Sequence, residues 1–170
     1  MTQTCSLATR ECIPCKGGVP PLKGAPMQAL LAELGQIKPV WVELGLQTIR
    51  PETADYLRRG YPLEVYDDAV RRLKAAGLTV VAHMILGLPG ETPEQMAQTA
   101  AYIGKSGADG VKFQLLHVMR GTDLAADYEA GKFEAMSLED YVRALAACVR
   151  ARNVPRRRTG PDGRSFGRGR

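Results

Sequence analysis

Glu43, Gly45 and Gln47 are residues whose types and spacing could do chemistry. They belong to the stretch VELGLQT and fall on one face of a strand, because side chains alternate along β-structure. An acid, a glycine and an amide pack poorly in an apolar core. The three residues therefore fit either a satisfied buried polar network or the contacts of a polar ligand.

A second stretch, HMILGLPGET, begins at His83 and ends an apolar run with a glycine-rich turn. His83, Ile85 and Gly87 share a face by the same alternation. The residues Gly87, Pro89 and Gly90 leave backbone that a flat or polar ligand could approach closely. The stretch lacks the Gly-Lys-Ser/Thr of a phosphate-binding loop, and a single histidine on an apolar strand also fits a core role. Two such strand ends, one βα unit apart, indicate a ligand site more strongly than either alone.

The four cysteines are unevenly placed, with Cys5, Cys12 and Cys15 near the start of the chain and Cys148 far from them. Three clustered cysteines are too few for a secreted disulfide scaffold. The cluster fits a metal site, a redox pair or coincidence. Cys148 lies in a helical stripe and is expected to be a small core residue.

Strand-like and helix-like periodicities alternate along the chain, which predicts an α/β fold with parallel strands. About four βα units are expected, enough for a smaller open α/β domain or a piece of a barrel. The predicted strands are residues 5–9, 39–47, 78–86 and 110–116, and the predicted helices are residues 27–36, 50–59, 62–76, 92–105 and a last one from Ser137.

The nearly continuous apolar runs predict strands that are buried on both faces. Helical spacing also predicts which side chains face the core. The expected stripes are Val65, Ala69, Val70 and Leu73 in the helix at residues 62–76, and Val142, Leu145, Ala146 and Val149 in the last helix.

The net charge of +5 belongs to the end of the chain. From Ala151 onward there are seven arginines and one acid, so residues 1–150 carry a net charge of −1. This placement removes most of the support for a nucleic-acid-binding domain. No apolar run approaches the ~20 residues of a membrane span, so the expectation is a cytoplasmic protein without a membrane partner.

Composition also predicts the domain organisation. Residues 1–26 are expected to be irregular with a short strand, residues 27–150 to form the partial barrel, and residues 151–170 to be a disordered arginine-rich tail. Nucleic acid would be a partner only through this tail or through a family relation.

VELGLQT followed by HMILGLPGET resembles the radical S-adenosylmethionine (SAM) superfamily. The likeness covers roughly residues 6–150 and includes RRGYPLEVYDDAVRRLKAAGL and FQLLHVMRGTDLAADYEAGKF. It is strongest to a bacterial group of unassigned substrate, in the branch of the Elongator catalytic subunit and oxygen-independent coproporphyrinogen oxidase. The resemblance implies a (β/α)6 TIM-like barrel, with SAM and a [4Fe–4S] cluster as the cofactors of the full-length family.

The resemblance also implies roles for individual residues. Gln47 matches the residue that contacts the SAM ribose, with Gly45 and Glu43 in the same element. His83 matches a polar SAM-contacting position. The adenine-contacting element corresponds to Met84, Ile85, Leu86, Gly87, Leu88, Pro89, Gly90 and Glu91. Gln114 and His117, near the end of the last strand, either face the same cavity or have surface or core roles.

The resemblance argues against a cluster on the three early cysteines. The family holds its cluster on Cys-x3-Cys-x2-Cys, whereas Cys5, Cys12 and Cys15 give Cys-x6-Cys-x2-Cys. The segment TRECIP, which contains Cys12, is similar to a later family segment whose cysteine is not a ligand. The chain is therefore expected to be a truncated radical SAM protein that starts near the third strand and is inactive alone.

Two alternative functions remain at this stage. The first is a small active radical SAM enzyme whose cluster is rebuilt on Cys5, Cys12 and Cys15. The second is a non-catalytic module that binds SAM, a nucleotide or RNA. The sequence identifies neither a substrate nor a catalytic residue.

Overall fold

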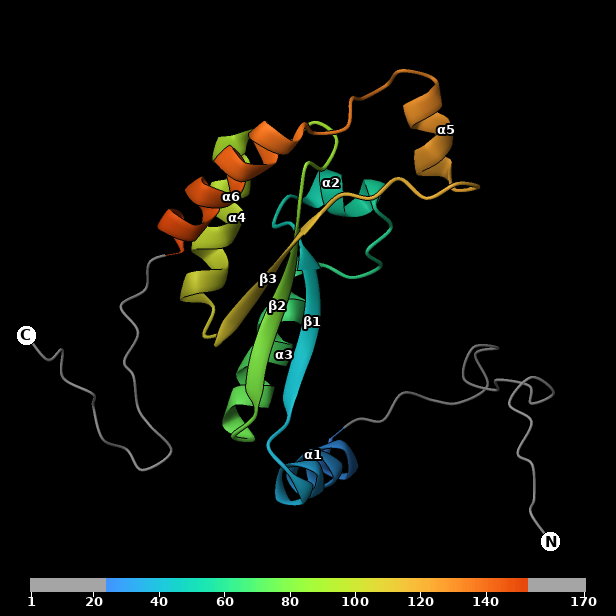
Figure 1. The fold of residues 1–170 in the computed structure, drawn as a ribbon. Coiled ribbons are helices and arrows are strands. Elements are labelled where there is room, and N and C mark those ends of the chain that lie inside the picture. Colours follow the sequence, from blue (N-terminus) through green and yellow to red (C-terminus); the bar gives the residue numbers. More distant parts are fainter. Residues whose placement is uncertain (1–23, 153–170) are drawn as a thin grey trace, which may run out of the picture. The chain divides into compact units, whose positions relative to one another are not determined.

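The computed structural model describes residues 24–152 (Figure 1). Cys5, Cys12 and Cys15, the predicted strand at residues 5–9 and nearly all of the predicted tail lie outside the described residues. The chain divides into two compact units, residues 1–38 and residues 39–170. The predicted domain boundaries at residues 26 and 150 stay a prediction.

The described elements follow the predicted order. In the first unit the described element is α1 (Ala25–Ile37). The second unit contains β1 (Trp41–Gln47), α2 (Pro51–Tyr56), α3 (Leu63–Ala75), β2 (Thr79–Leu86), α4 (Pro93–Lys105), β3 (Gly110–Leu115), α5 (Asp123–Glu129) and α6 (Leu138–Ala151). The three strands form one parallel sheet in the order β1-β2-β3. Two consecutive crossovers between parallel strands are the repeating unit of an α/β barrel.

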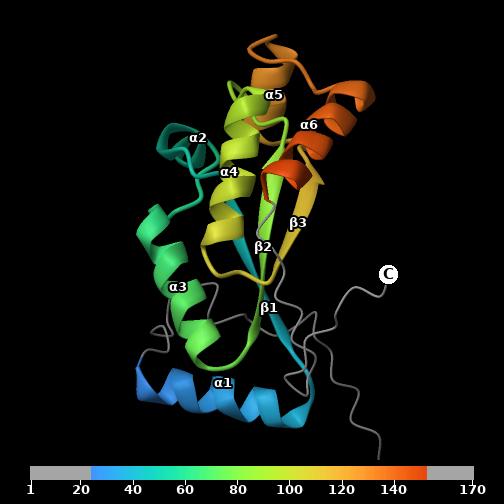
Figure 2. The same ribbon diagram turned by 90° about the vertical axis from the view of Figure 1, so that its left-hand side faces the viewer.

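The helices α3 and α4 run along one face of the sheet (Figures 1 and 2). On this side of β2, the residues Val80, Ala82, Met84 and Leu86 are fully buried. Of the alternate residues of β2, Thr79 is exposed and Val81, His83 and Ile85 are only partly buried. The prediction that both faces of the strands are buried is therefore wrong for the described sheet, because one face is covered by helices and the other is open.

We call the second side the open face and define it by the side chains that alternate with the buried ones. It comprises Trp41, Glu43 and Gly45 of β1, Val81, His83 and Ile85 of β2, and Gly110, Lys112 and Gln114 of β3. The register of the sheet confirms that these side chains lie on one face, since Gly45 pairs with His83 and His83 pairs with Lys112. Polar residues of three strands thus become neighbours on one surface.

The α4 helix begins with the capping box that its sequence predicts. The Thr92 side chain accepts a hydrogen bond from the Gln95 backbone, and the Gln95 side chain accepts one from the Thr92 backbone. The α5 helix, which periodicity did not predict, has a similar start at Thr122. No helix within residues 24–152 is long and apolar enough to cross a membrane.

Two predicted helix stripes need correction. In α3 the buried residues are Tyr66, Val70 and Leu73, while Val65 is 50% exposed. In α6 the buried residues are Ala144 and Cys148, while the predicted core residues Val142 and Val149 are more than half exposed. The α6 helix packs on α4 and the covered side of the sheet through small side chains, which let the two helices approach closely.

Candidate functional site

The carboxyl end of β1 is irregular at the predicted site. The pairing with β2 shifts between Gly45 and Gln47, and Gln47 has a φ of 59°. This turns the Gln47 side chain back over Gly45, where a Cβ atom would come within 2.7 Å of Gln47 Nε2. The Gln47 Oε1 atom is buried and has no hydrogen-bond partner among the described residues. An acceptor in this state is available to a ligand that donates a hydrogen bond.

Two side chains that sequence reasoning missed hold this irregular backbone. The Arg59 guanidinium donates to the carbonyl oxygens of Leu46 (3.0 Å) and Thr48 (2.7 Å), and the Tyr61 hydroxyl donates to the carbonyl of Gly45. Arg59 also lies over the Tyr61 ring. The sequence gives only a weak signal for them, namely an Arg-Gly-Tyr turn after α2.

The turn after β2 is built from backbone rather than side chains. Gly87 and Gly90 have φ values of 81° and 78°, and the Glu91 amide donates to the Leu88 carbonyl at 3.1 Å. Pro89 followed by a glycine with positive φ is the arrangement of a type II turn. Leu88 is 2% exposed and belongs to the core.

The two strand ends meet through one hydrogen bond. The hydroxyl of the fully buried Thr48 donates to Glu91 Oε1 at 2.5 Å. The other carboxylate oxygen, Glu91 Oε2, is buried and lacks a partner among the described residues. Each predicted element therefore contributes one buried acceptor without a partner, one on Gln47 and one on Glu91.

A charged cluster occupies the open face below these ends. Glu43 Oε2 lies 2.5 Å from His83 Nε2 and accepts from Lys112 Nζ at 3.3 Å, while Glu43 Oε1 accepts from Trp41 Nε1 at 3.0 Å. The hydrogen bonds from Trp41 and His83, together with the Lys112 charge, lower the pKa of Glu43 to about 2. Glu43 is thus a carboxylate at neutral pH. Sequence reasoning found Glu43 and His83 but missed Trp41 and Lys112.

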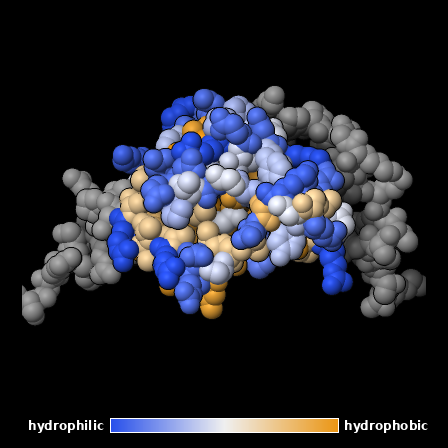
Figure 3. Space-filling view, turned by 90° about the horizontal axis from the view of Figure 1, so that it is seen from above, coloured by the Kyte–Doolittle hydropathy of each residue, from blue (hydrophilic) through white to orange (hydrophobic). Residues whose placement is uncertain are grey.

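Gln114 and His117 lie beside a pocket of about 510 Å³ at the end of β3, together with Ile85 and Tyr141. His117 also lines a second hollow of about 700 Å³ between α2 and α5. Seen from above, hydrophobic surface appears in the middle of the molecule and is bordered by hydrophilic side chains (Figure 3). The end of β3 therefore has space beside it for a further group.

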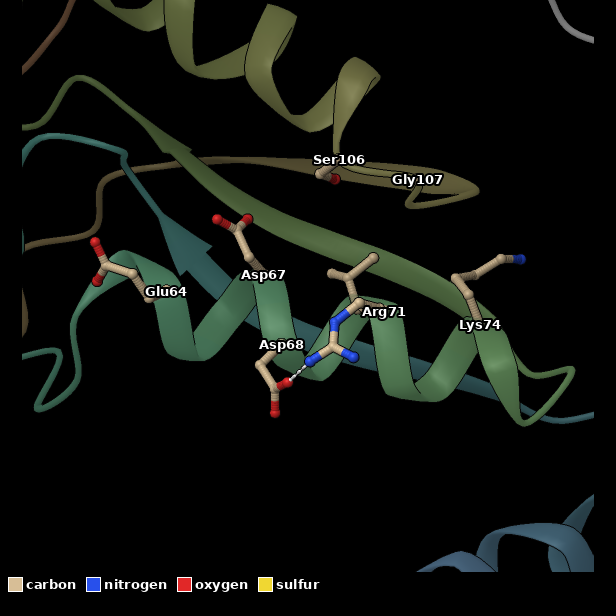
Figure 4. A pocket seen from close by; sticks show the side chains of 8 residues that line it. Glu64, Asp67, Asp68, Arg71, Lys74, Ser106 and Gly107 are labelled. Atoms are coloured by element: carbon tan, nitrogen blue, oxygen red, sulfur yellow. Dashed lines mark hydrogen bonds and ion pairs between the residues drawn. The ribbon is translucent and has the colours of Figure 1, made fainter.

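A third hollow lies along α3, and most of its charged residues already have partners (Figure 4). Asp68 forms an ion pair with Arg71, Lys74 pairs with Asp109, and Asp67 accepts from the Tyr102 hydroxyl. We therefore do not assign a ligand to this hollow.

Residues 24–152 contain no set of three or more His, Cys, Asp or Glu side chains that could hold a metal ion. Cys148 is fully buried, and its burial raises the pKa of the thiol to about 11. The prediction of a core role for Cys148 is confirmed. The alternative ligands Cys5, Cys12 and Cys15 lie outside the described residues.

Known families match the chain along most of its length. Residues 17–103 match the Radical SAM superfamily. The chain belongs to this superfamily. Residues 108–157 match the Radical_SAM C-terminal domain. The family is one that uses SAM and a [4Fe–4S] cluster, and its fold is the TIM-like barrel of which the described sheet forms a part.

Relatives and solved structures place this radical SAM protein in the Elongator and HemN branch. It is 40% identical over 115 residues to the uncharacterized protein YtqA of Bacillus subtilis (strain 168), covering 68% of this chain and 36% of YtqA. The archaeal Methanocaldococcus infernus Elp3 superposes with a TM-score of 0.64 at 26% identity, covering 74% of this chain and 29% of that one. HemN from Escherichia coli, a coproporphyrinogen III oxidase, shares the fold. It superposes with a TM-score of 0.56 at 19% identity, covering 72% of this chain and 28% of HemN. The chain thus spans about a third of the length of these proteins.

Proposed function

We propose that the ends of β1 and β2 form the SAM-recognising part of a [4Fe–4S]-dependent radical SAM enzyme. Gln47 would contact the ribose, and the backbone of residues 87–91 would lie against the adenine. Glu43, Gly45, His83 and Ile85 complete the site on the open face. The observation that carries this proposal is the buried Gln47 Oε1 atom without a partner.

An unsatisfied buried acceptor costs about 1–3 kcal/mol in a folded protein. A hydroxyl group that donates to Gln47 Oε1 would remove this cost, and a ribose offers two neighbouring hydroxyls. Gly45 makes room for the arrangement, because any larger residue would occupy the position of the Gln47 amide. The absence of a side chain at Gly45 therefore lets the Gln47 amide lie at this position.

The turn after β2 suits a flat ring with polar edges. Gly87 and Gly90 present backbone alone because they have no side chains, and Leu88 is buried in the core. Backbone amides and carbonyls at such a turn can meet the edge nitrogens of adenine directly. Glu91 Oε2 offers a further buried acceptor at the same turn.

The cluster ligands are not among residues 24–152. When bound, the cluster of this family supplies the electron that cleaves SAM and yields the 5′-deoxyadenosyl radical. We propose that the described residues bind and orient SAM but do not hold the cluster, so that this chain alone performs no radical chemistry. We infer a cytoplasmic location from the family relation.

Calorimetric titration of the full chain with SAM tests the proposal. Gln47→Ala should weaken binding at least about tenfold, because the buried hydrogen bond to the ribose is lost. Gln36→Ala is the matched control, since Gln36 is an exposed glutamine on α1. Failure of the unmodified chain to bind SAM, or equal binding by Gln47→Ala, would overturn the proposal.

Anaerobic reconstitution with iron and sulfide tests the statement about the cluster. We expect no stable brown chromophore. A chromophore with about four irons per chain that disappears when Cys5, Cys12 and Cys15 are all replaced by alanine would instead establish the small active enzyme as the correct function.

A further inference from the structure

Glu43 is surrounded by donors from all three strands. Its Oε1 atom accepts from Trp41 of β1, and its Oε2 atom faces His83 of β2 and Lys112 of β3. Both carboxylate oxygens are therefore already engaged by the protein. A residue in this state is poorly suited to contact a ligand directly, and its effect is exerted on the side chains that it holds.

An ionised Glu43 requires a hydrogen-bond donor at its contact with His83. With a pKa of about 2, Glu43 is ionised at neutral pH and can only accept hydrogen bonds. The 2.5 Å contact therefore requires a proton on His83 Nε2. In a neutral imidazole with Nε2 protonated, the other nitrogen, Nδ1, carries a lone pair and is an acceptor.

The Nδ1 atom of His83 has no hydrogen-bond partner among the described residues, and 21% of the side chain is exposed. It belongs to the open face, on the same strand as Ile85 and the glycine turn. The imidazole is thus fixed at one nitrogen and available at the other.

We propose that Glu43, held by Trp41 and Lys112, is a positioning residue that fixes His83 as the Nε2–H tautomer and thereby presents Nδ1 as an acceptor to a hydroxyl group of the bound ligand. This inference rests on the proposed function only for the identity of the ligand as SAM. Trp41 and Lys112 gain a role that their sequence positions alone do not suggest.

The tautomer can be measured without any ligand. The chain has two histidines, so His117→Gln leaves His83 as the single imidazole in a long-range ¹H–¹⁵N NMR spectrum. At pH 8 we expect a protonated Nε2 and an unprotonated Nδ1. Glu43→Gln, whose amide can also donate to the ring, should shift both nitrogen signals toward a mixture of the tautomers. The proposal would be overturned if the nitrogen signals stayed unchanged when Glu43→Gln is added. It would also be overturned if both ring nitrogens of His83 were protonated while Glu43 is present.

SAM titrations give an independent test. Glu43→Gln and His83→Ala should each weaken binding about tenfold, and the double variant should lose no more than His83→Ala alone. Independent, multiplicative losses would show that Glu43 contacts the ligand directly and would sink the proposal. Glu64→Gln, on α3 at the helix-covered side, is the control, and circular dichroism confirms that each variant is folded. If the unmodified chain does not bind SAM, the proposed function fails while the NMR result still decides the tautomer.

Discussion

At the scale of single residues, Gly45 matters because of the space that it leaves to Gln47. A methyl group at Gly45 would overlap the Gln47 amide, which is the end of a flexible side chain and can move away. We therefore expect Gly45→Ala to fold with a free energy of unfolding within about 1 kcal/mol of the unmodified chain. Its affinity for SAM should fall as far as that of Gln47→Ala, and the double variant should bind no more weakly. Urea denaturation and SAM titration measure the two effects, and normal SAM binding by Gly45→Ala would contradict the argument.

The Glu43 cluster should make stability depend on acid pH. The pKa of Glu43 is lowered from an ordinary 4.5 to about 2 in the folded chain, so its stabilising effect is complete above the ordinary value. The effect is lost as the pH falls through the interval between these values. Glu43→Gln should therefore flatten the fall of the thermal midpoint between about pH 5 and pH 2. Glu134→Gln, at an exposed loop position, serves as the control, and an equal slope in all three proteins would refute the expectation.

Sequence reasoning found those site residues that interrupt a strand pattern. Gln47 and the glycine turn after β2 stand out because they end apolar runs. Lys112 was missed because its partner Glu43 is 69 residues away in the sequence, and only the register of the sheet brings the two together. Trp41 lies two residues before Glu43 on the same strand, and alternation along β1 could have placed both on one face. The alternation of Lys112 with Gln114 on β3 was the one signal that could have placed Lys112 on the open face.

At the scale of elements, α4 connects the glycine turn to the core. Its capping box satisfies the first backbone amides, and Met96, Ala100 and Ile103 bury its inner face. Thr92→Ala should lower the free energy of unfolding by about 1 kcal/mol, because the cap of a core helix is lost. Thr122→Ala removes a similar cap from the seven-residue α5 and should cost the whole fold less. Urea denaturation compares the two variants, and an equal or larger loss in Thr122→Ala would be the contrary result.

The positions of the helices in the sequence were predicted better than the face that each helix buries. The capping and glycine signals located α3, α4 and α6, since these depend on local backbone chemistry. The buried side of α6 was assigned in part to the bulky Val142 and Val149, whereas close packing on α4 buries Ala144 beside the correctly predicted Cys148. In α3, likewise, the amphipathic Tyr66 replaces Val65 in the core. Hydropathy predicts that large apolar side chains are buried. Which side chains are buried in fact also depends on how closely the neighbouring helix or sheet approaches, and the sequence of one helix does not give that distance.

At the scale of the whole molecule, β2 is the centre of the described fold. It pairs with a strand on each side and buries four side chains beneath α3 and α4. The α5 helix has one buried residue, Ala125. It is joined to the end of α2 by the Tyr56–Asp127 hydrogen bond and to the turn after α2 by the Arg58–Asp123 ion pair, and both contacts are exposed. The stability of this fold is therefore uneven, with the open face and α5 least supported.

This unevenness predicts how amide hydrogen exchange responds to a core substitution. Met84 is fully buried at the middle of β2, so Met84→Ala should lower the free energy of unfolding by about 2–5 kcal/mol. We expect the amides of β2 to exchange only when the whole unit unfolds. Their protection free energy should therefore fall by as much as the free energy of unfolding falls in Met84→Ala. Amides of α5 exchange through local opening and should change much less. Val65→Ala, at a half-exposed position of α3, should shift neither set by more than about 0.5 kcal/mol. Equal loss of protection in β2 and α5 after Met84→Ala would show that α5 opens only with the core, and would contradict the division of stability described above.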